Sequence, residues 1–189
     1  MNTDTKQEKE TGRAVAVLGG GCFWCLDAVF REVEGVLTVM PGYCGGSVDN
    51  PGYQAVCEGT TGHAEVIRVE FDPAVLPYRA VLEIFFAMHD PTTLNRQGND
   101  VGTQYRSVIF PVDEAQRAEA AAFIAALDEQ KVFPGPIVTQ LEPPAHFWPA
   151  EEVHIDFFAQ NPGQPYCQYV VAPKLASFRA RFAQRRRPR

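Results

Sequence analysis

The chain has 189 residues, of which 46% are hydrophobic and 21% are charged, and its net charge is −6. This length suits one domain with a sizeable core, and the acidic balance argues against a nucleic-acid or anionic-membrane partner. No apolar run approaches the roughly 20 residues of a membrane span. Residues 1–13 are polar and mixed in charge, so we expect a disordered N-terminal tail rather than a signal peptide.

The chain contains five cysteines, an odd number that fits a disulfide scaffold poorly. Without an export signal, we expect a cytoplasmic protein whose thiols meet a reducing environment. Thiol chemistry or metal binding is therefore favoured over structural disulfides.

A glycine turn that carries a cysteine stands near the start of the chain. The apolar run 14–18 predicts a strand, and apolar residues at three-to-four spacing over 23–33 predict a helix. Residues 19–21 are glycines that join the two, where positive φ or close backbone approach is needed. Cys22 therefore falls at the first helical turn, where free N–H groups and the helix dipole favour a thiolate nucleophile.

A carboxylic acid stands on the apolar face of a later strand. Residues 35–39 predict a short strand, and the Gly- and Pro-rich segment 40–53 predicts a functional loop. Residues 64–72 alternate as a strand, with Glu65 on the same face as Ile67 and Phe71. A carboxyl group in that place loses water and its pKa rises, so Glu65 is a candidate proton donor.

The remaining segments predict further helices and strands of one domain. They are a helix over 77–88, a polar loop over 92–104, a strand over 105–110, a helix from Asp113 to about 130, a strand over 136–141, a helix from Pro149, a turn over 161–167 and a helix over 174–184. No repeat or linker divides the chain, so residues 14–184 are expected to form a single catalytic domain. Residues 185–189 are expected to form a basic C-terminal tail in solvent.

Seven motifs together resemble one family, the A-type peptide methionine sulfoxide reductases, over about residues 15–176. The motifs are Gly21-Cys-Phe-Trp24, Gly42-Tyr-Cys-Gly-Gly46, Asn50-Pro-Gly-Tyr53, Gly62-His-Ala-Glu65, His89-Asp-Pro-Thr92, Gln97-Gly-Asn-Asp100 with Gly102-Thr-Gln-Tyr-Arg-Ser107, and Pro149-Ala-Glu-Glu-Val-His154. The resemblance implies an α+β fold, a two-layer α/β sandwich related to the ferredoxin-like folds, with a mixed sheet flanked by helices. It also implies reduction of methionine-(S)-sulfoxide, free or in proteins, with no metal or organic cofactor.

The resemblance further implies roles for five catalytic residues. Cys22 attacks the sulfoxide sulfur and Glu65 protonates the sulfoxide oxygen. Tyr53 and Tyr105 hydrogen-bond that oxygen, and Asp100 orients the polar part of the site. A sulfoxide oxygen is a poor leaving group until it is protonated, so a neutral acid beside the sulfur nucleophile makes chemical sense.

The resemblance also implies a substrate wall and a recycling pathway. Phe23 and Trp24 form an apolar wall for the S-methyl group. Reduction leaves Cys22 as a sulfenic acid, which a second thiol converts to a disulfide that thioredoxin or a similar dithiol can open. Cys167, in a Gly- and Pro-rich segment, is the favoured resolving thiol. Cys25 departs from the glycine usual in the family and makes a Cys-x-x-Cys pair with Cys22, so direct resolution by Cys25 or a relay through both thiols stays open.

Alternative functions use the same thiols differently. One is a zinc module built from Cys22, Cys25, Cys44, Cys57 and His63, although a second tight pair of ligands is missing; otherwise Cys44 and Cys57 are bystanders. Another is a thioredoxin-like oxidoreductase that uses the Cys-x-x-Cys pair alone. A third is a non-enzymatic interaction domain, and it leaves the motifs unexplained. We expect a monomer in each case.

The segment 153–155 is a second departure from the family, which usually carries Tyr-His-Gln where this chain has Val-His-Ile. We therefore expect His154 to be structural, orienting a carboxylate or a loop rather than binding substrate.

Overall fold

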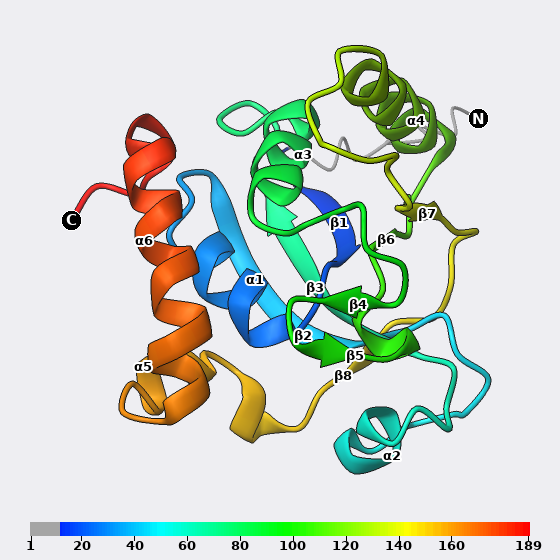
Figure 1. Ribbon diagram of the computed structural model, residues 1–189. Coiled ribbons are helices and arrows are strands. Elements are labelled where there is room, and N and C mark those ends of the chain that lie inside the picture. Colours follow the sequence, from blue (N-terminus) through cyan, green and yellow to red (C-terminus); the bar gives the residue numbers. More distant parts are fainter. Residues whose placement is uncertain (1–11) are drawn as a thin grey trace, which may run out of the picture.

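The computed structural model describes residues 12–189, and within them six strands form one mixed sheet (Figure 1). The strand order is β7 (Gln140–Leu141), β6 (Val108–Ile109), β1 (Ala14–Gly19), β3 (Ala64–Phe71), β2 (Val36–Cys44) and β8 (Trp148–Pro149). All neighbouring pairs are antiparallel except β6 and β7. A separate hairpin joins β4 (Arg96–Gln97) to β5 (Asp100–Val101). This arrangement confirms the predicted α+β fold with a mixed sheet.

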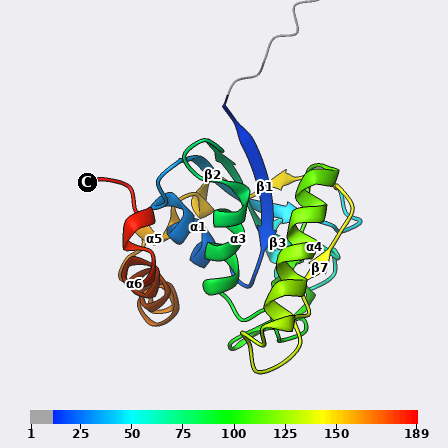
Figure 2. The same cartoon turned by 90° about the horizontal axis from the view of Figure 1, so that it is seen from above.

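The two faces of the sheet are covered differently. One apolar face packs against α1 (Phe23–Arg31), α3 (Tyr78–Ala87), α4 (Glu114–Glu129) and α6 (Ala172–Arg181) in a single large core. Figure 2 shows α1 and α3 together on the same side of β1. The other face carries a smaller cluster that includes Val17, Val66 and Val108 and is joined by Phe147 from the chain before β8. The sheet therefore fixes α1, and the loop before it, from behind.

Short helical segments complete the part of the molecule around the start of α1. They are α2 (Tyr53–Cys57), the 3-10 turns η1 (Thr103–Tyr105) and η2 (Glu152–His154), α5 (Phe157–Gln160) and the π-helical turn η3 (Cys167–Val171). Several of them replace predicted elements. The loop expected over 40–53 begins only after Cys44, because backbone pairing with β3 extends β2 through Pro41 and Gly42. The strand expected over 105–110 shrinks to Val108–Ile109 because η1 occupies its start.

Three predictions about the C-terminal half are wrong. The strand over 136–141 is reduced to Gln140–Leu141, since its partner β6 offers only two residues. The helix from Pro149 does not form: Pro149 belongs to β8, and Asp156 adopts a left-handed conformation with φ 50° between η2 and α5. The last helical run begins at residue 165 instead of 174, so Cys167 lies in a helix and not in a turn.

The basic C-terminal segment is docked and does not extend into solvent as predicted. The backbone N–H of Arg187 donates to the carbonyl of Glu32, and the carbonyl of Arg185 accepts from the N–H of Glu34. The Arg187 side chain donates to the carbonyl of Arg31. Arg186 lies 3.7 Å from the Glu32 carboxylate. This segment therefore closes the C-terminal end of α1.

The predicted tail over residues 1–13 lies mostly outside the described residues. Of the chain from residue 12 onward, no helix is both long enough and apolar enough to span a bilayer.

Gly21 has the most demanding backbone of the turn before α1, and it yields a stability prediction. Its φ is +90°, and a Cβ atom there would lie 2.6 Å from Cγ of Gln97. Gly21→Ala should therefore lower the free energy of unfolding by about 1–3 kcal/mol, measured by denaturant unfolding. Gly163→Ala is the matched control, because nothing lies within 4 Å of its Cβ position. Equal effects of the two substitutions would contradict this account of the turn.

Candidate active site

Cys22 occupies the N-cap of α1, with extended backbone angles of φ −60° and ψ 127°. Its side chain is only 7% exposed. The glycine turn before it is held tightly, because a Cβ on Gly19 would lie 2.9 Å from the carbonyl of Glu65 and one on Gly20 would lie 2.9 Å from the His89 ring. These close approaches fix the backbone that leads into Cys22 against β3 and His89.

The electrostatics of Cys22 differ from the expectation drawn from the helix start. Burial raises the pKa of the Cys22 thiol well above its ordinary value, and the charges of Glu65 and Cys25 raise it further. The backbone N–H of Trp24 lowers it, as expected at a helix N-terminus, but burial outweighs this. The substrate-free site therefore holds Cys22 as a thiol, and the predicted thiolate requires a further change in its surroundings.

Glu65 lies on β3 opposite Tyr43 of β2 and is 1% exposed. Neither of its carboxyl oxygens has a hydrogen-bond partner among the residues that the structure describes. Burial raises the pKa of Glu65 well above its ordinary value, the charge of Asp100 adds to this, and the Phe23 backbone N–H acts in the opposite direction. An unpartnered carboxylate would be very costly here, so Glu65 is held as a neutral acid with a free proton to donate.

Two tyrosine hydroxyls accompany this acid. Tyr53 comes from α2 and Tyr105 from η1, and both side chains are half-buried. Burial raises both pKa values, and the charges of Glu65 and Cys22 raise them further. Both phenols are therefore neutral hydrogen-bond donors beside the acid and the thiol. Burial raises the pKa of Cys57, which the sequence marked as a bystander, and the Tyr53 and Tyr105 side chains lower it, so this thiol lies close to both hydroxyls.

Asp100 is tied to a tyrosine that the sequence analysis missed. The Tyr166 hydroxyl donates to Oδ2 of Asp100 at 2.6 Å. Tyr166 directly precedes Cys167 in a segment that the sequence predicts to be a turn. The Gly and Pro residues there favoured a turn, so the sequence analysis did not mark Tyr166 as part of a helix. This bond links the β4–β5 hairpin to the last helical run and fixes the Asp100 carboxylate.

The aromatic residues after Cys22 differ in exposure. Phe23 is completely buried, whereas Trp24 is half-buried and stacks on Phe157 with ring centroids 3.8 Å apart and planes within 4°. The Trp24 indole N–H donates to Nδ1 of His154 at 3.1 Å. His154 thus orients the Trp24 ring, whereas the sequence led us to expect that it would orient a carboxylate or a loop. Phe157 was missed because it was placed on a regular helix.

A carboxylate outside the predicted set braces this aromatic group. Glu151 accepts from the Tyr43 hydroxyl at 3.1 Å and from the Tyr53 backbone N–H at 3.2 Å. The start of α2 is thereby held against the segment that carries His154. Glu151 belongs to one of the seven motifs, but nothing in the sequence showed which backbone it would reach.

The two candidate resolving thiols share one apolar cluster. Cys25 is 2% exposed and Cys167 is fully buried, and they pack together with Ala28 and Val171. Cys22 belongs instead to the large core next to this cluster. The backbone N–H of Cys25 donates to the carbonyl of Cys22 at 3.2 Å, as in one helical turn. All five cysteines are free thiols.

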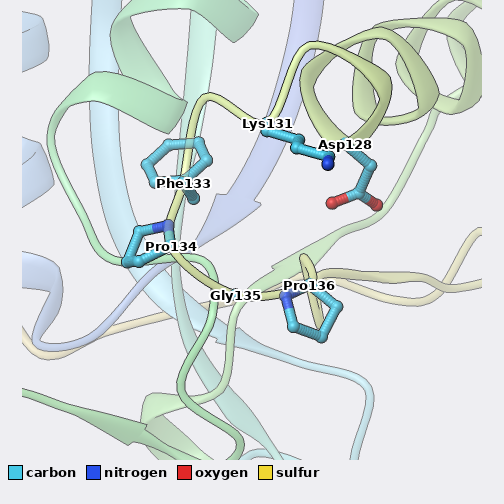
Figure 3. Close-up of a pocket in the computed structure, with 6 residues that line it drawn as sticks. All are labelled: Asp128, Lys131, Phe133, Pro134, Gly135 and Pro136. Carbon is cyan, nitrogen blue, oxygen red and sulfur yellow. The ribbon is translucent and has the colours of Figure 1, made fainter.

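The ligands of the zinc alternative are not brought together. Both ring nitrogens of His63 are occupied by backbone groups, one accepting from the Gly46 N–H at 2.9 Å and the other meeting the Val48 carbonyl at 2.6 Å. Over residues 12–189, no group of three or more His, Cys, Asp and Glu side chains is arranged to hold a metal ion. A hollow after α4, lined by Phe133, Pro134 and Pro136, includes none of the predicted site residues (Figure 3).

Comparisons with known proteins agree with this geometry. The family model described as peptide methionine sulfoxide reductase matches residues 14–186. A peptide methionine sulfoxide reductase of Ralstonia nicotianae is 54% identical over 98% of both chains. One from Chromobacterium violaceum is 55% identical over 89% of this chain and 96% of its own.

Solved structures show the same likeness. Mxr1 from Saccharomyces cerevisiae in reduced form has a TM-score of 0.76 and 32% identity, covering 84% of this chain and 91% of its own. Methionine sulfoxide reductase A of Corynebacterium diphtheriae has a TM-score of 0.73 and 30% identity, covering 85% and 80%. The chain belongs to the peptide methionine sulfoxide reductase family and is an oxidoreductase that reduces methionine sulfoxide.

Proposed function

We propose that the protein reduces methionine-(S)-sulfoxide, free and in proteins, with Cys22 as nucleophile and Glu65 as proton donor. The observation that supports this most is the buried Glu65 carboxyl, whose oxygens have no hydrogen-bond partner over residues 12–189 and which, if ionised, would raise the pKa of Cys22. The choice of the S epimer rests on the family resemblance.

The first step needs a proton and an electron pair delivered to different atoms of the substrate. The sulfoxide oxygen enters the space beside Glu65 and accepts its proton, while the partly positive sulfur comes to lie against Cys22. That positive charge offsets the burial that raises the Cys22 pKa, so the thiol ionises when substrate is bound. The oxygen takes a proton from Glu65 and the proton that Cys22 loses, and the sulfur anion attacks the substrate sulfur, so that an S–S bond forms as the S–O bond breaks and water leaves. This water attacks the Cys22 sulfur and breaks the S–S bond, which releases methionine, leaves Cys22 as a sulfenic acid and returns a proton to Glu65. The substrate sulfur gains two electrons and Cys22 loses two.

The polar residues around Glu65 hold the oxygen during this step. Tyr53 and Tyr105 are neutral phenols whose pKa values respond to both Glu65 and Cys22, so their hydroxyls are suited to donate to the sulfoxide oxygen. Asp100, fixed by Tyr166, keeps the Glu65 pKa raised. Together they stabilise the charge that develops on the oxygen.

The apolar side of the site receives the S-methyl group. Trp24 is the ring that solvent reaches, and Phe157 and His154 set its orientation. Phe23, fully buried, supports Tyr53 from behind with ring centroids 6.3 Å apart. We propose that Trp24 contacts the methyl group and that Phe23 shapes the wall indirectly.

Recycling is proposed to run from Cys22 to Cys25 and then to Cys167. The sequence favoured a direct Cys22–Cys167 disulfide through a mobile segment, but Cys167 is buried in a helical turn. Cys25 is close enough to Cys22 to affect its pKa, and it packs in the same cluster as Cys167. It therefore lies between the other two thiols of the proposed pathway. Three-residue spacing at a helix start permits the first disulfide.

The final reductant is proposed to be thioredoxin or a similar dithiol in the cytoplasm. The disulfide needs a two-electron donor, and exchange with a dithiol regenerates both thiols. Mxr1 of Saccharomyces cerevisiae has been solved in complex with Trx2, and that structure shares the fold with a TM-score of 0.56.

Removal of the nucleophile gives the first prediction. Cys22→Ser should abolish methionine formation from methionine-(S)-sulfoxide with dithiothreitol as reductant, because an alcohol is not ionised at neutral pH. Chromatography of the amino acids measures the product. Cys44→Ser, a buried cysteine outside the site, is the control that should retain turnover. Retained turnover in Cys22→Ser would refute the nucleophile.

Loss of the acid should slow the sulfoxide step. Glu65→Gln keeps the shape but cannot donate a proton, so single-turnover methionine formation should fall by about 10²–10⁴-fold. In the wild type this rate should decline as pH rises through the raised Glu65 pKa, because the neutral acid disappears, and the variant should lack that decline. A variant with the wild-type rate and pH profile would remove Glu65 from the mechanism.

The same substitution should alter stability in a pH-dependent way. The folded pKa of Glu65 is raised, so the folded state binds its proton more tightly and wild-type stability falls as pH rises from the unfolded value of about 4.3. The free energy of unfolding of Glu65→Gln, relative to that of the wild type, should rise by at most about 1.4 kcal/mol per pH unit between the unfolded and the folded pKa of Glu65. Urea unfolding at several pH values measures this gain. The exposed Glu129→Gln should show no such trend, and a flat difference for Glu65→Gln would contradict a neutral buried acid.

The relay predicts which disulfide forms first. After one equivalent of substrate without reductant, peptide mapping of rapidly quenched samples should find Cys22–Cys25 before any bond to Cys167. In Cys25→Ser, formation of the disulfide should slow while the first mole of methionine still appears. An early Cys22–Cys167 bond, formed at the same rate in Cys25→Ser, would restore the direct pathway.

A further inference from the structure

A small cavity of about 180 Å³ lies on the side of Asp100 that faces the last helical run. One wall is the β4–β5 hairpin with Asp100. The other wall is formed by Tyr166, Val170 and Lys174. Neither Cys22 nor Glu65 lines it, so the cavity is a space that the sulfoxide step leaves unused.

The helical wall of this cavity belongs to the same face that covers Cys25. Tyr166, Val170 and Lys174 follow one another at intervals of four residues, the spacing of one helix face. Tyr166 and Val170 both pack against the cluster that contains Cys25. Lys174 follows one turn later and lines the same cavity as Tyr166 and Val170.

Lys174 is a cation without a carboxylate partner. It is half-buried, and it forms no salt bridge with any other group in the part of the chain that the structure describes. The other lysine after residue 12, Lys131, lies in the loop after α4 (Figure 3). Asp100 lines the same cavity but forms no salt bridge with Lys174 among the described residues. A half-buried ammonium group without an ion-pair partner is suited to stabilise a nearby thiolate.

The groups that face Cys25 act in opposite directions. Burial raises the pKa of Cys25 to about 11, the charge of Lys174 lowers it, and the charges of Asp100 and Glu65 raise it. The hydroxyl proton of Tyr166 is donated to Asp100, so it is not available to Cys25. Cys22 stands one turn earlier on α1, and Cys167 packs in the same cluster. For Cys167, burial raises the pKa and no cation opposes it.

We propose that Lys174 activates Cys25 as the thiol that resolves the Cys22 sulfenic acid. The inference rests on the proposed function and goes beyond it by naming the residue that makes Cys25 nucleophilic. Cys25 loses its proton and attacks the Cys22 sulfur. The S–S bond forms as the S–O bond of the sulfenic acid breaks, and the oxygen leaves with a proton as water. Cys25 is oxidised and Cys22 is reduced, so no other reactant is needed.

The size of the effect follows from thiol reactivity. If loss of the cation raises the Cys25 pKa by about one unit, the thiolate fraction at neutral pH falls about tenfold, but the more basic thiolate reacts about threefold faster. The net rate should therefore fall about threefold per unit of pKa at neutral pH. Above the pKa, the variant should match or exceed the wild type, because every molecule is then ionised.

The experiment uses the full chain in a Cys167→Ser background, so that only the Cys22–Cys25 step follows sulfoxide reduction. Rapid mixing with one equivalent of methionine-(S)-sulfoxide measures methionine formation and free-thiol loss over a range of pH. Lys174→Met should leave the first mole of methionine unchanged and slow thiol loss about threefold at neutral pH. Lys174→Arg should restore the rate by restoring the charge, and Lys131→Met should behave as the wild type.

A second measurement follows Cys25 directly. Carbon-13 NMR of labelled cysteine Cβ in the reduced protein should give a Cys25 pKa that is higher in Lys174→Met than in Lys174→Arg. An unchanged titration, or a rate lowered equally at all pH values and not rescued by arginine, would overturn the inference. If the wild type forms no methionine at all, the proposed function fails instead, so the two failures are distinguishable.

Discussion

The structure depends on one costly feature, a carboxylic acid buried away from water with no side chain that neutralises it. Glu65 is 1% exposed, and its oxygens meet no hydrogen-bond partner over residues 12–189. Such a group is stable only as the neutral acid. The sheet supplies this environment, because β3 lies between β1 and β2 and holds Glu65 next to the glycine turn of Cys22. In the mechanism that we propose, the fold thereby keeps a proton near the Cys22 sulfur, and sulfoxide reduction needs both groups.

The segments around Cys22 and Glu65 are short, and side-chain hydrogen bonds hold them in place where regular secondary structure does not. Glu151 fastens α2, His154 orients Trp24, and Tyr166 fixes Asp100. Each brace joins residues at least 66 positions apart in the chain. The last helical run therefore contributes to both halves of the chemistry, through Asp100 on the sulfoxide side and through the Cys25 cluster on the thiol side.

Helices and strands with regularly spaced apolar residues could be predicted from the sequence. Segments held in place by side-chain contacts with distant residues could not. The strand of Glu65, the helix after Cys22 and the helix capped by Asp113 appear as expected, and the Asp113 carboxylate accepts from the Gln116 N–H at 2.8 Å. The helix expected from Pro149 fails because Asp156 turns left-handed. Cys167 was placed in a mobile turn because Gly and Pro precede it, yet the helix begins before it and buries it. The motifs supplied the residues that we propose to react, whereas Glu151, Phe157 and Tyr166 depend on contacts that span the chain.

The protonation state of Glu65 in the folded, substrate-free protein is the central claim. Infrared difference spectroscopy between the wild type and Glu65→Gln measures it directly, because protonated and ionised carboxyl groups absorb at different frequencies. The account predicts the band of a protonated carboxyl group at neutral pH, converting to carboxylate only as the solution becomes alkaline. A carboxylate band at neutral pH, titrating near the ordinary value for glutamate, would contradict it.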